Sequence, residues 1–415
     1  MTKKTLKSLC IIVFIFTLAF LFLPLNTQAK SKPTYTIKPS SKPCDKEMLK
    51  FHTYNKKTRQ YYTIRSYMEK LEKKGGGTLI LTKGTYTITN TIYVPGDVTI
   101  KLSNGTVIKK GSVTKVNDMP ASNSIFMLIE PSKSLKKNAV SKYNGAKNIS
   151  FTGSGNATID MQNYKASADA AIAIEGCHNK NIKISGITFK NMYDGHFIEM
   201  DATDTAEITD CTFSDIKGTM LREAINLDTP DEVTQGFHAD WAKLDCYANK
   251  NIEIKNCTFK NMYRAIGTHN YSGNHPHENI NISNCTFSNI SQYAVELMYW
   301  KASTIENCTM TGNSYAADNA KPSKKGAAIF AAGVINPTIR NNIIDSFAVG
   351  AYLVPWEGQS DEEKSAYEPI NCIFSSENLE TLKTNICGPL VAIKEATCKA
   401  TFSDEKYLHI PMKTN

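Results

Sequence analysis

Short alternations of apolar and polar residues recur along most of this 415-residue chain. One unit of the pattern is a polar lead-in, Ile-x-Ile, two small or polar residues, and then Cys-Thr-Phe or a close variant. The apolar positions alternate with period two over three or four residues and are rich in β-branched side chains, which predicts short strands rather than helices. The units span residues 179–191, 205–215, 249–261, 277–289 and, in a divergent copy, 301–313.

The spacing of these units predicts a repeat architecture. The aromatic residue or Met that closes each unit is Phe189, Phe213, Phe259, Phe287 or Met310, and three of the four gaps are 23 to 28 residues. The remaining gap is about one unit plus an insertion. A fixed period in this range is typical of solenoids, in which a unit buries its apolar face only by stacking on its neighbours.

A second apolar run follows each unit, so that every turn holds two or three short strands. Asn191, Asp215, Asn261 and Asn289 recur at one corner, where a residue that tolerates left-handed backbone is needed. The sequence therefore predicts an all-β fold, a single-stranded right-handed parallel β-helix. The second runs are HFIEMD (196–201), EAINLD (223–228), RAIGTH (264–269), YAVELM (293–298) and AAIFAA (327–332).

The N-terminal part of the chain predicts export and a cap. Residues 1–29 have a basic start, an apolar stretch and a small-residue cleavage site, and are predicted to be a signal peptide, with an uncleaved membrane anchor as the alternative. Residues 30–57 are predicted to be a linker whose first part, rich in Ser, Lys and Pro, is unstructured. Within 58–73, an apolar stripe at helical spacing predicts a helix that covers the open first coil.

The rest of the chain is predicted to be one β-helix domain and a closing segment. With its N-terminal cap, the β-helix domain is expected over 58–355, and residues 112–144, which lack the repeat, are expected to form a loop over one face. Residues 356–415 are expected to be a C-terminal capping segment of mixed structure. We expect a secreted, extracellular protein, with the cell envelope as a further location, and no stable membrane insertion after signal cleavage, because no second apolar run is long enough to span a bilayer.

Charge and cysteine usage add two expectations. The net charge of +9 suits an acidic polymer as partner, although a solvated surface also explains it, and no basic stripe with interleaved aromatics indicates nucleic acid. Four cysteines occupy one inward column that Ile187 fills in an earlier coil, which predicts stacked small apolar groups rather than disulfides. These are Cys211, Cys257, Cys285 and Cys308. Whether Cys387 pairs with Cys398 is left open, and no cysteine–histidine cluster resembles a zinc site.

Together, the Gly-rich opening with GTY at 84–86, the stretch at 145–155 and the NxxI-xx-CxF coils resemble the pectate-lyase-like (pectin lyase fold) β-helix superfamily. The resemblance covers roughly residues 60–355. It implies the β-helix fold, and it implies glycan binding on one long sheet face, since the superfamily includes polysaccharide lyases, polygalacturonase-type hydrolases, epimerases, tailspikes and noncatalytic surface proteins. Asn226-Leu227-Asp228 and Gly267-Thr268-His269 faintly resemble two polygalacturonase motifs, but the adjacent Asp pair and the later Arg-x-Lys of that family are missing.

Aligning the second runs on their central apolar residues places polar side chains in outward columns on neighbouring coils. The alanines before the central residues are expected to leave a groove beside these columns. The facing of the residues at the start of each run is left open, because a corner lies there. The predicted catalytic residues are Glu199, Asp201, Glu223, Asp228, Arg264 and His269. The predicted substrate-binding residues are His196, Asn226, Asp240, Trp241, Tyr293 and Glu296.

These columns predict a polysaccharide-degrading enzyme, with hydrolysis by paired carboxylates favoured. Coils about 4.8 Å apart would put Asp201 and Asp228 at the separation of a retaining pair or of two calcium ligands, and would put Glu199 and Asp228 on a longer diagonal that suits an inverting pair. The favoured hydrolase would require no cofactor. One alternative is a lyase, in which Arg264 abstracts a proton while Glu199, Asp201 and Asp228 hold Ca²⁺. The other alternative is a noncatalytic glycan-binding surface protein.

The insertion at 229–250 must leave the solenoid beside these columns, and loops on a rigid scaffold often bind ligands. Within it, Trp241 could stack on a sugar ring or pack the loop against the coil, and the sequence does not decide between these alternatives.

Overall fold

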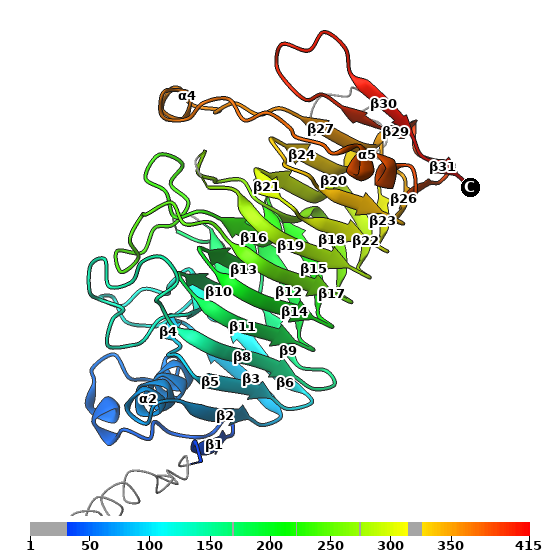
Figure 1. Cartoon of the computed structure of the whole chain (residues 1–415). Coiled ribbons are helices and arrows are strands. Elements are labelled where there is room, and N and C mark those ends of the chain that lie inside the picture. The colour runs from blue at the N-terminus through cyan, green and yellow to red at the C-terminus, as the bar shows by residue number, and fades with distance from the viewer. Residues whose placement is uncertain (1–30, 168–169, 221, 274, 314–325) are drawn as a thin grey trace, which may run out of the picture. The chain divides into compact units, whose positions relative to one another are not determined.

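The computed structural model describes residues 31–415 except 168–169, 221, 274 and 314–325. Residues Pro33–Asn415 form one compact unit, and the predicted signal peptide lies outside the described residues. Within this unit, short strands coil repeatedly and pair in parallel with the strands of the next coil, so that the coils stack one after another (Figure 1). The predicted right-handed parallel β-helix is confirmed. Among the described residues, no helix has the length and apolar character needed to cross a bilayer.

Three series of strands make the walls of the β-helix. The first wall forms its own sheet, which contains the Ile-x-Ile strands of the repeat. Its strands are β1 (Thr34–Ile37), β2 (Gly77–Leu81), β5 (Val98–Leu102), β8 (Lys147–Gly153), β11 (Lys180–Ser185), β14 (Asp204–Thr209), β17 (Lys250–Lys255), β19 (His277–Ser283), β21 (Trp300–Lys301), β22 (Thr304–Glu306) and β25 (Thr338–Arg340).

The other two walls share one sheet, because β18 (Thr258–Gly267) and β20 (Thr286–Met298) run through the corner between them. The second wall carries the Phe residues of the repeat and consists of β3 (Gly84–Ile88), β6 (Thr106–Lys110), β9 (Thr158–Asp160), β12 (Thr188–Tyr193), β15 (Thr212–Lys217), the first halves of β18 and β20, β23 (Thr309–Gly312), β26 (Ile343–Asp345), β28 (Ile386–Cys387) and β31 (Lys413–Thr414).

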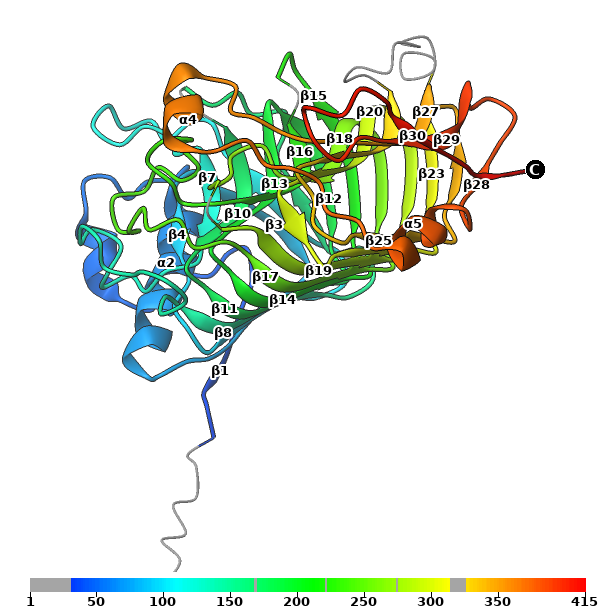
Figure 2. The same cartoon turned by 45° about the horizontal axis from the view of Figure 1, so that its top comes forward.

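The third wall holds the predicted polar columns, and several of its strands lie side by side in Figure 2. It consists of β4 (Ile92–Tyr93), β7 (Ser124–Met127), β10 (Ala171–Cys177), β13 (Gly195–Asp201), β16 (Glu223–Asp228), the second halves of β18 and β20, β24 (Ala327–Ala332), β27 (Val349–Val354) and β29 (Ile393–Cys398), with β30 (Leu408–Pro411) antiparallel to β29.

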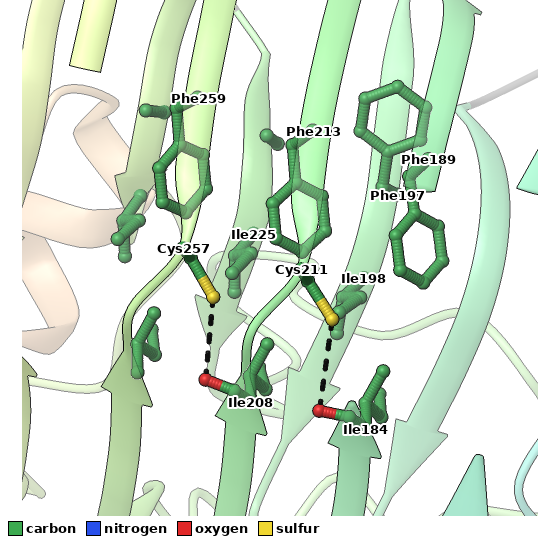
Figure 3. Packing of buried hydrophobic residues seen from close by; sticks show 14 of the residues in the cluster. Ile184, Phe189, Phe197, Ile198, Ile208, Cys211, Phe213, Ile225, Cys257 and Phe259 are labelled. Carbon is green, nitrogen blue, oxygen red and sulfur yellow. Dashed lines mark hydrogen bonds between the residues drawn. The ribbon is translucent and has the colours of Figure 1, made fainter. Parts of the chain in front are cut away.

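Apolar side chains stack from coil to coil inside the β-helix. Phe189, Phe213, Phe259 and Phe287 form a ladder in which successive rings are stacked with centroids 4.9 to 5.0 Å apart. Figure 3 shows the first three of these rings. Because much of each ring is covered by its neighbours in adjacent coils, no single unit would be stable alone. The predicted corner is also confirmed, since Asn191, Asp215, Asn261 and Asn289 all have positive φ.

The cysteine column is buried and contains no disulfide. Cys211, Cys257, Cys285 and Cys308 follow Ile187 along the core, and all ten cysteines among the described residues are free, including Cys387 and Cys398. The Cys211 and Cys257 thiols donate to the carbonyl oxygens of Ile184 and Ile208 one coil earlier (Figure 3). The prediction of stacked small apolar groups is therefore confirmed.

Both ends of the β-helix are covered. At the N-terminal end, α2 (Arg59–Lys73) buries Tyr61, Ile64, Met68 and Leu71 and contacts β2, β3 and β4, as predicted. After β27, two short helices, α4 (Asp361–Ala366) and α5 (Ser376–Leu382), are followed by the four short strands β28 to β31.

Two expected boundaries are corrected. The described part of the predicted linker 30–57 is structured: β1 pairs in parallel with β2, and a 3₁₀ helix, η1, spans Lys46–Lys50. The polar composition of this segment concealed a strand that covers the edge of the first coil. Parallel pairing also continues past residue 355, because β27 pairs with β29, and the expected loop 112–144 contains β7.

Candidate functional site

The predicted columns are in register on the third wall. Asp201 pairs with Asp228 across β13 and β16. Glu199 pairs with Asn226, which pairs in turn with Gly267 on β18, and Gly267 pairs with Glu296 on β20. Aligning the runs on their central apolar residues therefore predicted which side chains lie next to each other.

The first residue of each run faces outward, which strict alternation of inward and outward residues does not predict. Phe197 and Ile198 are consecutive, yet both are buried in the core cluster. Two successive inward residues shift the phase, so that His196 reaches the outer surface and lines a cavity. The alanines expected to leave a groove, among them Ala224 and Ala265, occupy the same inward position as Phe197 and are buried in the core, so that expectation was wrong.

Mostly polar residues from six neighbouring coils and the insertion line a cavity of about 260 Å³. Of the predicted residues it contains His196, Glu199, Asn226, Asp228 and His269. Its complete lining is Thr91, Asn123, Ser124, Met127, Ala170, Ile172, Glu175, His196, Glu199, Arg222, Asn226, Asp228, Gln235, Gly236, His238, Ala239, His269 and Asn270.

Glu223 lies behind this cavity as a buried anion. Its Oε1 accepts a hydrogen bond of 3.0 Å from Arg264 Nη1, and its Oε2 lies 3.1 Å from His269 Nδ1. Its backbone oxygen lies 2.7 Å from His196 Nδ1. Burial opposes the charge, but His269, Arg264 and His196 hold the pKa of Glu223 well below its usual value. Glu223 is therefore ionised and positions three cationic or polar side chains.

His269 connects Glu223 to the cavity. Its Nε2 lies 3.5 Å from Asp228 Oδ2 and 2.9 Å from Arg222 Nη1. Burial disfavours the imidazolium, but Asp228 and Glu223 outweigh burial and raise the pKa of His269 to about 9. A hydrogen bond from Arg222 requires an Nε2 that carries no proton, because the guanidinium can only donate hydrogen bonds. A protonated Nε2, which lies 3.5 Å from Asp228 Oδ2, could not accept a hydrogen bond from Arg222.

Three carboxyl groups face the cavity from three successive coils. Glu175 pairs in register with Glu199, and Asp228 lies on the next coil. Burial, Glu175 and Asp228 raise the pKa of Glu199 well above its usual value. Asp228 is held by hydrogen bonds of 3.0 Å from Asn226 Nδ2 and 2.9 Å from the backbone amide of His269, which partly offset the rise in its pKa due to burial. Burial and the neighbouring carboxylates thus favour the protonated form of Glu199, whereas hydrogen bonds stabilise the anion of Asp228.

Asp201 has the predicted register but does not line the cavity. Its side chain is 0 % exposed, and neither carboxylate oxygen has a hydrogen-bond partner among the described residues. Its in-register neighbour Cys177 is buried in a cluster with Phe237 and Trp241, so the insertion packs over this part of the wall. Burial, Glu199 and Asp228 raise the pKa of Asp201 well above its usual value. Its surroundings therefore favour the neutral form of Asp201, and the carboxylates proposed to hold Ca²⁺ are divided between the cavity and this cluster.

The remaining predicted residues lie outside the cavity. Trp241 is 2 % exposed, packs edge-on against Phe237 and donates to Met127 Sδ, so it packs the insertion down and does not face a ligand. Asp240 is exposed on the same loop. Tyr293 is buried and stacks on Phe330. Glu296 is an inner partner of Arg264, with Nη1 and Oε2 2.7 Å apart. Burial raises the pKa of Glu296 to about 8, although Arg264 opposes this.

Sequence reasoning missed Glu175, Arg222 and His238. Glu175 was open to prediction, because AIAIEGC at 171–177 aligns with the second run that contains Glu199. Arg222 precedes its strand and His238 lies in the insertion, so neither has a periodic position that could have indicated it.

His196, Glu223 and His269 also form a cluster of metal-ligating types, with one ligand atom from each within 4.8 Å of the others. The two Nδ1 atoms that face this cluster are already within hydrogen-bond distance of Glu223 oxygens, and Arg264 neutralises the carboxylate. We therefore describe the cluster as a satisfied hydrogen-bond network.

Comparison with known proteins agrees with this architecture. The model of the family "Right handed beta helix region" matches residues 124–310 and 198–365, which together span more than half of the chain. The chain belongs to this right-handed β-helix family. A search of curated proteins finds no match.

Solved structures with the same fold include both an adhesin and an enzyme. Two structures of the surface adhesin PfbA of Streptococcus pneumoniae match with TM-scores of 0.58 and 0.59 at 17 % and 18 % identity, covering 83 % and 78 % of this chain and 77 % and 84 % of theirs. A family 28 exopolygalacturonase of Yersinia enterocolitica matches with a TM-score of 0.53 at 11 % identity, covering 92 % of this chain and 78 % of that chain. At these identities the likeness concerns the fold alone.

Proposed function

We propose that this right-handed β-helix protein is an exported hydrolase of acidic polysaccharide, with Glu199 as general acid and Asp228 as the second catalytic carboxylate. The observation that carries the proposal is the convergence of Glu175, Glu199 and Asp228 on one cavity beside Arg222 and His269. Glycoside hydrolysis requires two carboxyl groups, one protonated and one ionised, and their different environments set this difference.

The roles follow from the surroundings of each group. Burial and the neighbouring carboxylates raise the pKa of Glu199, and its protonated form can donate to the leaving oxygen of a glycosidic bond. Asp228 is oriented by Asn226 and the His269 amide, so it can activate water. The two lie on neighbouring coils and differ by two positions along the strand, so their Cα atoms are about 8 Å apart. We propose inversion, in which a water molecule stands between the two carboxyl groups.

The cations in the cavity favour an acidic sugar. With a pKa of about 9, His269 is charged at neutral pH, and Arg222 is then free to pair with a carboxylate or sulfate of the substrate. The known polygalacturonase with this fold acts, as its name says, on such a polymer. Export of the chain through the predicted signal at 1–29 would bring it to extracellular glycan.

The lyase alternative has less support. Arg264, its proposed proton acceptor, is not part of the cavity lining and is held by Glu223 and Glu296. Burial would lower its pKa, but these carboxylates raise it, so Arg264 remains charged and a poor base. Because the expected ligand set for Ca²⁺ is divided, no step is assigned to a metal.

Incubation with a panel of neutral and acidic polysaccharides tests the proposal. We expect new reducing ends without unsaturated-uronate absorbance, and their loss in Glu199→Gln and Asp228→Asn. Glu253→Gln is the matched control, because the Glu253 side chain is half exposed and lies on the first wall, whereas the cavity lies on the third. Absorbance of an unsaturated product would indicate elimination, and binding without any product would indicate a noncatalytic glycan-binding protein.

A further inference from the structure

A second cavity lies on the third wall, at its C-terminal coils. It has a volume of about 540 Å³ and shares no residue with the cavity that contains Glu199. Aromatic side chains supply much of its lining, among them Phe330, Tyr352, Phe402 and Tyr407. Its floor is formed by β24 and β27, and its sides by the segment that contains α4 and by the loop between β29 and β30.

Aromatic rings dominate this cavity. Phe330 and Tyr352 are stacked, with centroids 6.2 Å apart, and Tyr352 and Tyr407 are stacked at 6.3 Å. Phe402 and Tyr407 are 44 % and 40 % exposed, although both are large side chains that proteins usually cover. Flat aromatic faces at the surface of a polar cavity are suited to the apolar faces of sugar rings.

The charges of this cavity suit an anion. Its ionisable lining includes two lysines, Lys364 and Lys399, and one carboxylate, Glu357. Lys399 Nζ lies 5.6 Å from the centroid of the Tyr407 ring, so a cation stands beside the aromatic surface. A ligand that stacks on the rings and carries a negative group would use both features.

The two cavities lie over the same columns of side chains. From Asn226 the register runs through Gly267 and Glu296 to Phe330 and Tyr352. Asn226 and Phe330 are three coil steps apart, which corresponds to about 14 Å along the wall. This separation is short compared with an extended polysaccharide, so one glycan chain is long enough to contact both cavities.

We propose that the aromatic cavity is a distal subsite for an acidic oligosaccharide, in which sugar rings stack on Phe402 and Tyr407 while Lys399 pairs with the negative group. This inference rests on the proposed function, because it assigns the occupant to the same glycan chain. It makes affinity depend on chain length, since a short oligosaccharide cannot occupy both cavities.

The test measures binding of a galacturonic acid octasaccharide and disaccharide by calorimetry, with the full mature chain carrying Glu199→Gln to prevent cleavage. In this background we expect Phe402→Ala and Lys399→Gln each to weaken binding of the octasaccharide about tenfold, and to change binding of the disaccharide less than twofold. Lys394→Gln is the matched control, because Lys394 is an exposed lysine on β29 outside the cavity. We expect it to change neither affinity. The affinity for the fully methyl-esterified octasaccharide, which carries no negative group, should be the same with and without the Lys399→Gln change.

Two results would overturn the subsite: equal octasaccharide affinity in all variants, or no binding of the octasaccharide at millimolar concentration. The proposed hydrolase can fail separately. If no polysaccharide is cleaved while octasaccharide binding still depends on Phe402 and Lys399, the aromatic subsite stands and the catalytic assignment falls. Circular dichroism of each variant shows that a weaker affinity is not due to unfolding.

Discussion

His269 should carry a positive charge at neutral pH, and Glu223→Gln should remove much of the electrostatic attraction that stabilises this charge. The pKa of His269 is raised from 6.5 to about 9. A change of this size corresponds to about 3 kcal/mol of preference for the charged form. With Asp228 still in place, we expect the isosteric Glu223→Gln variant to lower the pKa of His269 to about 7.5, since one of its two anionic neighbours becomes neutral.

The same shift predicts how stability depends on pH. Because the folded-state pKa of His269 lies above its unfolded value, its contribution is fully present below about pH 6.5 and is lost as the pH rises through about 9. We therefore expect the free energy of unfolding to fall by up to about 3 kcal/mol across this window from His269 alone. The fall should be smaller in Glu223→Gln.

Histidine ring resonances followed by NMR titration check this directly, with His269→Gln to assign the signal. Glu253→Gln serves as control for a carboxylate that does not contact the ring. A His269 pKa below 7 in the unaltered protein, or one that Glu223→Gln leaves unchanged, would refute the proposed charge network.

Three further changes test the packing around the site. Phe259→Ala should cost about 3–5 kcal/mol in denaturant unfolding, because it interrupts a ladder with rings 4.9 Å away on both sides, and a cost under 1 kcal/mol would contradict coil-to-coil stacking. Asp201→Asn should retain polysaccharide turnover and raise stability at pH 8, because ionisation of a buried acid with a raised pKa is unfavourable at that pH. A loss of turnover as large as in Asp228→Asn would show instead that Asp201 is a catalytic residue. Gly267→Ala should lower turnover and the melting temperature, because its Cβ would lie 2.9 Å from Glu296 Cβ, and unchanged values of both would show that the wall adjusts freely.

The sequence alone was sufficient to predict the fold and the register. Ile198, Ile225, Ile266 and Val295 are central apolar residues that must stack, so aligning them also aligns the polar residues one and three positions later. Stacking in a solenoid is nearly one-dimensional, which makes such alignment reliable.

The shape of the site could not be predicted in the same way. Strict alternation does not reveal that Phe197 and Ile198 both face the core, and that local irregularity brings His196 to the cavity. Nor does it reveal what covers a column. Trp241 packs the insertion down on one part of the wall, which encloses Asp201 while Asp228 lines the cavity, and this difference depends on contacts between segments that have no periodic relation.

A double-mutant cycle of Glu199→Gln and Asp228→Asn most directly tests the claim that neighbouring coils bring the two carboxyls together as one catalytic unit. Each single variant should lower turnover by roughly 10²- to 10⁴-fold, the range for loss of general acid or base catalysis. The double variant should then be about as slow as the slower single variant, because residues that act as a unit are non-additive. Two losses that multiply in the double variant, or single variants that keep full turnover, would contradict the account.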